Sequence, residues 1–221
     1  GGALTSPAAL VLNGGNVAIN GSLGFNGSLA PASRDLTINA RTEGGTILSN
    51  VSGVLTVNDL TLTSLNGSAT LDSPTNSISG NVSASLGTGT LTLVNNRATA
   101  LGDVTAGNLT LTSNGDITQP TGNLAVAGTT TVDATGGNIT LANAGNDFGT
   151  VVANGAAVSI RDVNNLNVGQ VTATGLTLQA GGNIEQTAGN ITATSLNVTA
   201  GGNANLTLGQ GNDISGTVLG N

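Results

Sequence analysis

Apolar and polar residues alternate in short runs along most of this chain. The recurring motif is apolar–polar–apolar, flanked by glycine and asparagine. Alternation with a period of two predicts a short strand with one buried face, and each run ends within about five residues at Gly, Asn or Asp. The clearest occurrences are Val17–Ile19, Leu36–Ile38, Leu55–Val57, Leu60–Leu62, Leu91–Leu93, Leu109–Leu111, Leu124–Val126, Ile139–Leu141, Val158–Ile160, Leu166–Val168, Leu176–Leu178, Leu196–Val198 and Leu206–Leu208. No segment has a sustained apolar stripe of helical period, so the pattern predicts an all-β chain.

A longer repeat underlies the second half of the chain. Residues 102–123 (GDVTAGNLTLTSNGDITQPTGN) match residues 169–190 (GQVTATGLTLQAGGNIEQTAGN) at 12 of 22 positions, with a constant offset of 67 residues. The match continues loosely: Ile139–Leu141 corresponds to Leu206–Leu208, and Thr150–Val151 corresponds to Thr217–Val218. We infer a degenerate duplication, which is typical of repeat architectures.

Short strands at this spacing are compatible with a sandwich, a barrel or a solenoid. Three features favour a solenoid. The repeat is self-similar along the chain, small aliphatic side chains fill a narrow bore without aromatics, and turns such as Gly136–Asn138 and Gly181–Asn183 suit corners that recur in register. Because 67 residues divide into coils of about 22, we expect roughly ten coils and a rod of about 50 Å at the spacing of β-strands.

The repeats predict one continuous domain over residues 1–221, since no linker or run of charges interrupts them. Before Leu36 the pattern is looser, so residues 1–34 are expected to form irregular N-terminal coils. Residues 102–168 and 169–221 are the two units related by the 67-residue repeat.

Composition narrows the chemistry. The chain has 35 glycines, 1% aromatic and 7% charged residues, and a net charge of −7, whereas average domains carry about 25% charged residues. It contains no histidine, cysteine, lysine or tyrosine, which excludes the usual zinc ligands, a thiol nucleophile, a Ser-His-Asp triad and a Schiff-base lysine. The acidic balance argues against nucleic acid or an anionic membrane as a partner.

The run from Gly145 to Val151, followed by Ala157–Asp162 and Leu166–Gly169, resembles the β-helical repeat region of filamentous haemagglutinin-like bacterial adhesins. Residues 127–131 and 137–148 look like the same repeats, and the resemblance extends over 100–221 and, more loosely, 35–99. It is similar to regions of two-partner secretion and autotransporter-type surface proteins. The resemblance implies a right-handed parallel β-helix that acts as a surface stalk or adhesive fibre.

The central threonine of the strand motif is one candidate for binding. These threonines could form a column on one face that contacts ice, carbohydrate or a crystalline surface; alternatively, threonine simply favours exposed strand positions. The central residue is often Asn, Ser or Ala, which favours the second interpretation. The threonines concerned are Thr37, Thr56, Thr61, Thr92, Thr110, Thr140, Thr177 and Thr207.

Acidic residues are a second candidate, since glycosidase-like chemistry needs two carboxylates within about 5 to 10 Å. Eleven are scattered along the chain: Asp35, Glu43, Asp59, Asp72, Asp103, Asp116, Asp133, Asp147, Asp162, Glu185 and Asp213. Sugar-cleaving sites also use basic and aromatic side chains that this chain lacks, so we expect no catalytic site. Gly209–Asp213 contains a GxGxD fragment of a calcium nonapeptide repeat, but no second copy follows at nine-residue spacing, so we expect a turn and no metal or cofactor.

A solenoid needs terminal caps, and neither end of this sequence offers a capping helix or charge cluster. We therefore expect a slice of a longer secreted rod, or copies that stack end to end. The sequence predicts a structural and adhesive shaft segment of a secreted or surface-anchored bacterial protein, with any targeting segment outside these residues. The alternatives are a self-assembling extracellular filament or sheath subunit and, third, a polysaccharide-active β-helix. Expected partners are adjoining repeats or other copies and a host-cell, matrix or glycan surface, with no nucleic acid and no membrane insertion.

Overall fold

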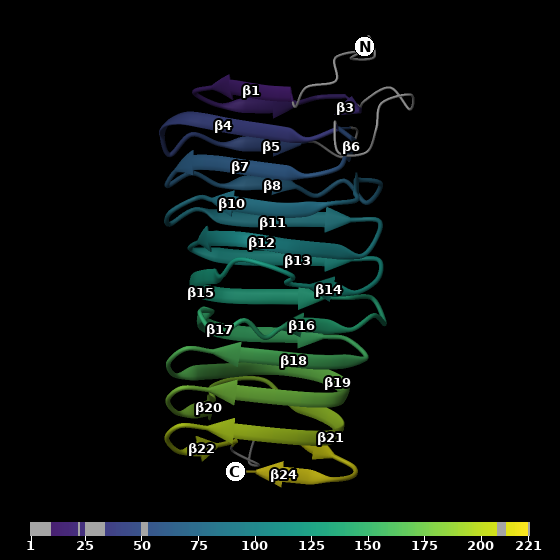
Figure 1. Cartoon of the computed structure of the whole chain (residues 1–221), viewed down its shortest axis with the longest axis vertical. Coiled ribbons are helices and arrows are strands. Elements are labelled where there is room, and N and C mark those ends of the chain that lie inside the picture. Colours follow the sequence, from purple (N-terminus) through teal and green to yellow (C-terminus); the bar gives the residue numbers. More distant parts are fainter. Residues whose placement is uncertain (1–9, 22, 25–33, 50–52, 207–210, 221) are drawn as a thin grey trace.

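A computed structural model describes residues 10–21, 23–24, 34–49, 53–206 and 211–220. In these residues every regular element is a β-strand, as the alternating pattern predicts (Figure 1). The strands are β1 (Leu10–Gly14), β2 (Val17–Ile19), β3 (Leu23–Gly24), β4 (Leu36–Glu43), β5 (Ile47–Ser49), β6 (Leu55–Val57), β7 (Leu60–Leu65), β8 (Ala69–Leu71), β9 (Ser77–Ile78), β10 (Asn81–Ser85), β11 (Thr90–Asn95), β12 (Thr99–Ala106), β13 (Asn108–Ser113), β14 (Ile117–Thr118), β15 (Leu124–Asp133), β16 (Ile139–Leu141), β17 (Asp147–Asn154), β18 (Ala157–Asp162), β19 (Leu166–Ala180), β20 (Ile184–Gln186), β21 (Ile191–Ala200), β22 (Ala204–Asn205), β23 (Asp213–Ile214) and β24 (Val218–Gly220).

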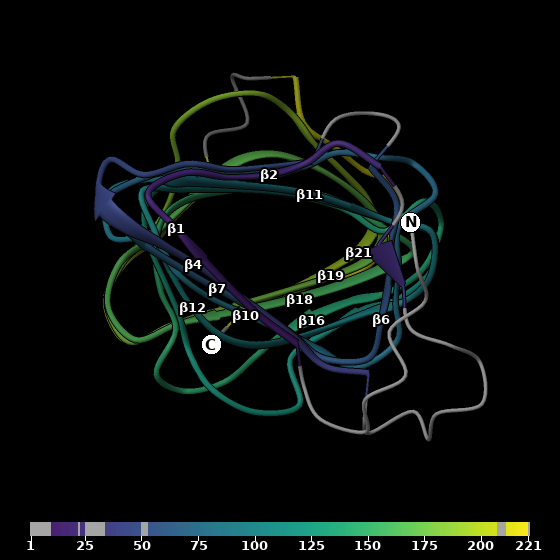
Figure 2. The same ribbon diagram turned by 90° about the horizontal axis from the view of Figure 1, so that it is seen from above.

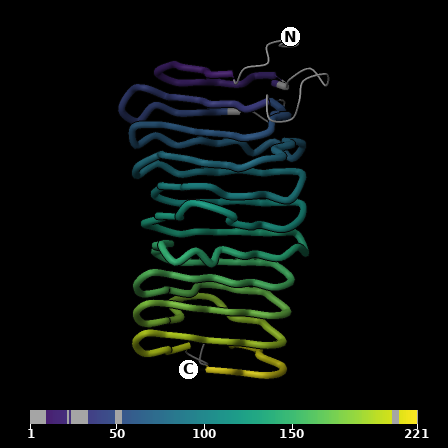
Figure 3. Tube along the Cα trace, in the orientation of Figure 1, coloured from purple at the N-terminus to yellow at the C-terminus, as the bar shows by residue number. Residues whose placement is uncertain are grey.

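The strands pair in parallel with strands of the turns before and after them, so the chain winds as a parallel β-helix (Figure 3). β11, for example, lies between β8 and β13. The helix has about nine turns, one fewer than the roughly ten coils predicted from the sequence. Turns vary in length: the first runs from Leu10 to its partner Leu36, whereas a later one runs only from Leu91 to Leu109.

Inward-facing aliphatic side chains fill the space that the ribbons enclose in the view along the axis (Figure 2). Residues in register stack on one another: Leu91 lies between Ala69 and Leu109, and all three are buried. Phe148 is the one aromatic residue of the core within the described part of the chain. Aliphatic layers spaced by one strand therefore make a continuous packed column, as the composition predicts.

The predicted strand motifs coincide with observed strands, except that Leu206–Leu208 extends outside the described residues. Within residues 1–34, the structure places β1, β2 and β3, and residues 1–9, 22 and 25–33 lie outside the described residues. In the part of the chain that the structure describes, no helix is long and apolar enough to cross a membrane.

Candidate functional site

Polar side chains inside the column mark the corners of the helix. At each of these corners, an inward-facing amide or carboxylate accepts a hydrogen bond from a backbone N–H that belongs to an adjacent turn. The acceptor–donor pairs are Asn76–Leu55 (2.9 Å), Asn95–Ile78 (2.9 Å), Asn146–Leu124 (2.9 Å), Asp162–Phe148 (2.9 Å) and Asn212–Ile191 (2.8 Å). A strand ends at each corner and leaves backbone groups without ladder partners, so these inner corner residues satisfy groups that burial would otherwise penalise.

The most enclosed of these corners holds two amides that pair with each other. Asn146 accepts a hydrogen bond from Nε2 of Gln119 (2.7 Å) and donates one back to Oε1 of Gln119 (2.8 Å). Asn146 is fully buried and also donates to the carbonyl of Leu141 (3.2 Å). One repeat later, Gln186 and Asn212 make the same reciprocal bonds, at 2.7 and 2.6 Å. The repeat therefore carries a specific internal polar lock, which we call the amide pair.

Sequence reasoning missed the amide pair, although a signal was present. Gln119 and Gln186 are among the identical positions of the repeat, and each lies two residues after an inward isoleucine, Ile117 or Ile184. Strand alternation therefore places both glutamines inward, where a polar residue needs an internal partner.

Asp162 takes the corner position in the turn after Asn146. It is 1% exposed, and its carboxylate accepts the N–H groups of Phe148 (2.9 Å) and Asn164 (2.8 Å). Desolvation raises the pKa of Asp162 above its usual value of 3.8, outweighing the two hydrogen bonds, which lower it; the charge of Asp147 raises it further. The fold therefore favours the protonated form of this side chain.

Most other acidic side chains for which contacts are described act at outer corners. Asp35 accepts the N–H of Asp59 (3.1 Å), and Asp59 in turn accepts that of Asn81 (2.7 Å) in the following turn. Further pairs of this kind are Asp103–Asn123, Asp116–Asn138 and Asp133–Thr135, at 2.7 to 2.8 Å. These carboxylates hold the turns in register, which gives them a structural role that the search for catalytic pairs did not anticipate.

The structure does bring Asp147 and Asp162 close together. Asn164 links them, because its backbone N–H binds Asp162 while its side-chain amide donates to Asp147 (3.1 Å). Asp147 is exposed, but Asp162 points into the core, so the two carboxylates do not face one solvent-accessible space. Within the described residues, no group of three or more acidic side chains is arranged to hold a metal ion.

The predicted threonine column is divided. Thr37 and Thr61 are followed in register by Ser83; Thr92 and Thr110 belong to another series. Thr207 lies outside the described residues, as do Gly209 and Gln210 of the GxGxD fragment, whose Asn212 instead belongs to the amide pair.

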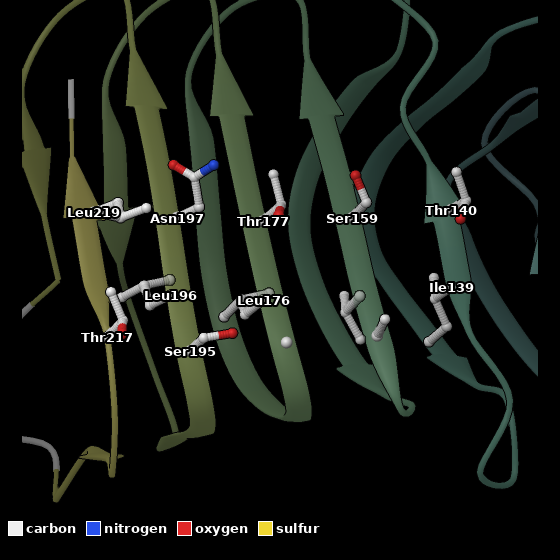
Figure 4. Close-up of a pocket in the computed structure, with 13 residues that line it drawn as sticks. Ile139, Thr140, Ser159, Leu176, Thr177, Ser195, Leu196, Asn197, Thr217 and Leu219 are labelled. Atoms are coloured by element: carbon white, nitrogen blue, oxygen red, sulfur yellow. The ribbon is translucent and has the colours of Figure 1, made fainter.

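A shallow depression on the outer surface is the best-defined external feature, and we call it the outer groove (Figure 4). Thr140, Ser159, Thr177 and Asn197 form its main row in register across four strands, and Gly175 leaves space beside them. Its volume is about 280 Å³, and its lining residues are uncharged and non-aromatic. The groove offers hydroxyl and amide groups at one-strand intervals to a neutral polar ligand.

Comparison with known proteins identifies the repeat. A sequence family described as repeats of unknown function (DUF5649) matches residues 88–154 and 155–221. The starts of the two matches are separated by the same 67 residues as the offset found in the sequence. No curated protein and no solved structure matches the chain.

Proposed function

Because the chain belongs to the DUF5649 family of repeats and folds as a continuous parallel β-helix, we propose that it is the structural and adhesive shaft of a secreted or surface-anchored bacterial protein. The observation that carries this proposal is the uninterrupted stacking of turns, each tied to its neighbours by strand ladders and corner hydrogen bonds. The proposal assigns no catalytic reaction and no cofactor to the chain.

The shaft works mechanically. Bending a stack of turns would open backbone ladders and separate packed aliphatic layers on one side, so many small interactions resist the bend together. The corner residues add directional bonds that oppose sliding of one turn over the next; Asn138, for instance, binds Asp116 on one side and Ala157 on the other. The result is a stiff spacer that holds an adjoining region away from the cell.

The extracellular location draws on two supports. The first is the resemblance of residues 145–169 to repeats of filamentous haemagglutinin-like adhesins. The second is the use of Gly, Asn, Thr and small aliphatics in place of cysteine and lysine along the whole chain. The adhesive part of the proposal assigns neutral glycan or matrix surfaces to the outer groove, where contact energy per turn is small and many turns act together.

Localisation and deletion in the native bacterium test the proposal. Immunogold labelling of intact cells should place the chain outside the envelope, and protease added to intact cells should remove the label. Deleting residues 88–154, which is one whole repeat, should shorten the surface structure while leaving it exported. Recovery of the chain only from the cytoplasm would refute the surface function.

Adhesion is tested separately with variants of the outer groove. Thr177→Lys and Ser195→Lys fill the groove, and Thr110→Lys, on another exposed strand position, serves as the control. Reduced attachment of the groove variants to glycan- or matrix-coated surfaces, with the control unchanged, is the expected result. Equal attachment of all variants would remove the adhesive assignment and leave the shaft.

A further inference from the structure

The last turn of the rod leaves apolar positions open. Val218 is 60% exposed, although its register partner Leu196 in the previous turn is only 6% exposed. Leu206 and Ile214 are half-buried at the same end and line, with Val218, an open hollow of about 570 Å³. We call this surface the C-terminal face. It is the end of the packed aliphatic column with its next layer absent from the described residues.

The preceding repeat shows what covers such a face. By the 67-residue offset, Val218 corresponds to Val151 and Leu206 corresponds to Ile139. Val151 lies between Thr130 and Val168 and is 1% exposed. Ile139 is covered by Val158 and is fully buried. The same surface is thus buried inside the molecule by the parallel strands of a following turn.

The opposite end of the rod offers a turn of the required kind. β1 and β2 pair with β4 and β5 on one side, and Leu10, Leu12 and Val17 on them are half-buried against the core. Their alternation matches the C-terminal face: Leu12 faces the bore as Val218 does, whereas Val11 faces outward as Leu219 does. All strands run parallel, so a second copy with its axis aligned presents β1 and β2 in the orientation that stacking requires.

We propose that the C-terminal face binds the first turn, β1 and β2, of a second copy of this chain, head to tail. The contact pairs two different surfaces, so successive copies extend into a filament and do not close as a symmetric dimer. A second copy is favoured over an unrelated partner because the internal junction between the repeats already shows this apolar, strand-paired contact. The inference goes beyond the shaft function, which depends only on stacking inside one molecule.

Two substitutions on the same strand test the contact. Val218→Asp places a carboxylate in the bore, whereas Leu219→Asp, at 58% exposure on the outward side, is the matched control. Sedimentation velocity between about 10 µM and 1 mM should show the wild-type mass rising above 21.2 kDa with concentration. Val218→Asp should stay at monomer mass, and Leu219→Asp should associate as the wild type does.

Complementation distinguishes this head-to-tail contact from other modes of association. Leu12→Asp blocks the opposite face and should also give monomers by itself. An equimolar mixture of Val218→Asp and Leu12→Asp should form a single species of twice the monomer mass, because each variant retains one intact face. Circular dichroism confirms that both variants are folded. A wild type that remains monomeric throughout, a mixture that stays monomeric, or equal effects of Val218→Asp and Leu219→Asp would overturn the proposal.

Discussion

Replacing Asn146 with alanine should destabilise the protein more than the replacement of any surface asparagine, because Asn146 is fully buried and joins three other residues. The substitution removes the hydrogen bonds to Gln119, to the N–H of Leu124 and to the carbonyl of Leu141. Each buried group left without a partner costs about 1–3 kcal/mol. Partial relaxation reduces the sum, so we expect a loss of about 4 kcal/mol in the free energy of unfolding.

The second repeat supplies the matched control. Asn212 makes the same bonds to Gln186 and to the N–H of Ile191 but is only half-buried, so water can replace what Asn212→Ala removes. We expect this variant to lose about half as much stability, or about 2 kcal/mol. Adding Gln119→Met to Asn146→Ala should recover about 1 kcal/mol, because it removes the amide that the first substitution leaves unpaired.

Urea denaturation followed by far-UV circular dichroism is the appropriate assay, since the chain has no tryptophan or tyrosine for fluorescence. Native-state hydrogen exchange then locates the loss, which should be largest at the amide of Leu124. A loss below about 1 kcal/mol for Asn146→Ala, or equal losses for Asn146→Ala and Asn212→Ala, would refute the role given to the amide pair.

Three further substitutions test other parts of the account. The Thr130 hydroxyl is the buried side-chain group without a hydrogen-bond partner in the described part of the chain, so Thr130→Val should raise the urea midpoint by about 1 kcal/mol of stability; a lower midpoint would contradict this. Asp162 has a raised pKa, so its contribution is greatest below its ordinary pKa and decreases as pH rises through the folded-state value; the stability of the wild type should fall relative to Asp162→Asn between about pH 3 and 7, and parallel profiles would count against the assignment. Thr135 has a φ of 46°, where a β-branched residue is strained, so Thr135→Gly should raise the melting temperature, by about 1 kcal/mol of stability, and a decrease would argue against that strain.

The sequence carried most of the fold because the repeat states the same local rule many times. Leu-Thr-Leu at residues 109–111 and 176–178 places aliphatics inward and threonine outward in both repeats, as observed. The number of turns was less accurate, since dividing 67 residues evenly ignores the variation in corner length. Phe148 and Asp162, for example, are bonded across 14 residues, whereas Asn81 and Asp59 are bonded across 22.

The polar corners were harder to predict because their roles depend on contacts between turns. Asp59, Asp116 and Asp162 have similar sequence surroundings, yet the first two bind backbone N–H groups at outer corners and the third lies in the core. Alternation can place Gln119 inward, but it cannot show that Asn146, from the next turn, meets it there. The outer groove likewise depends on Gly175 falling beside a row of small residues, which only the register reveals.

The central claim, a stiff column of turns in fixed register, is tested most directly by a distance between two spin labels along the rod. Cysteines at Leu48 and Val152 are free of competition because the chain has no native cysteine. Five successive register pairs connect them, Leu48–Thr70, Thr70–Thr92, Thr92–Thr110, Thr110–Thr131 and Thr131–Val152. At about 4.8 Å for each step, pulsed double electron–electron resonance should give one narrow distribution near 24 Å, widened only by the label linkers. A broad distribution, or a mean beyond about 40 Å, would contradict the stacked and rigid shaft.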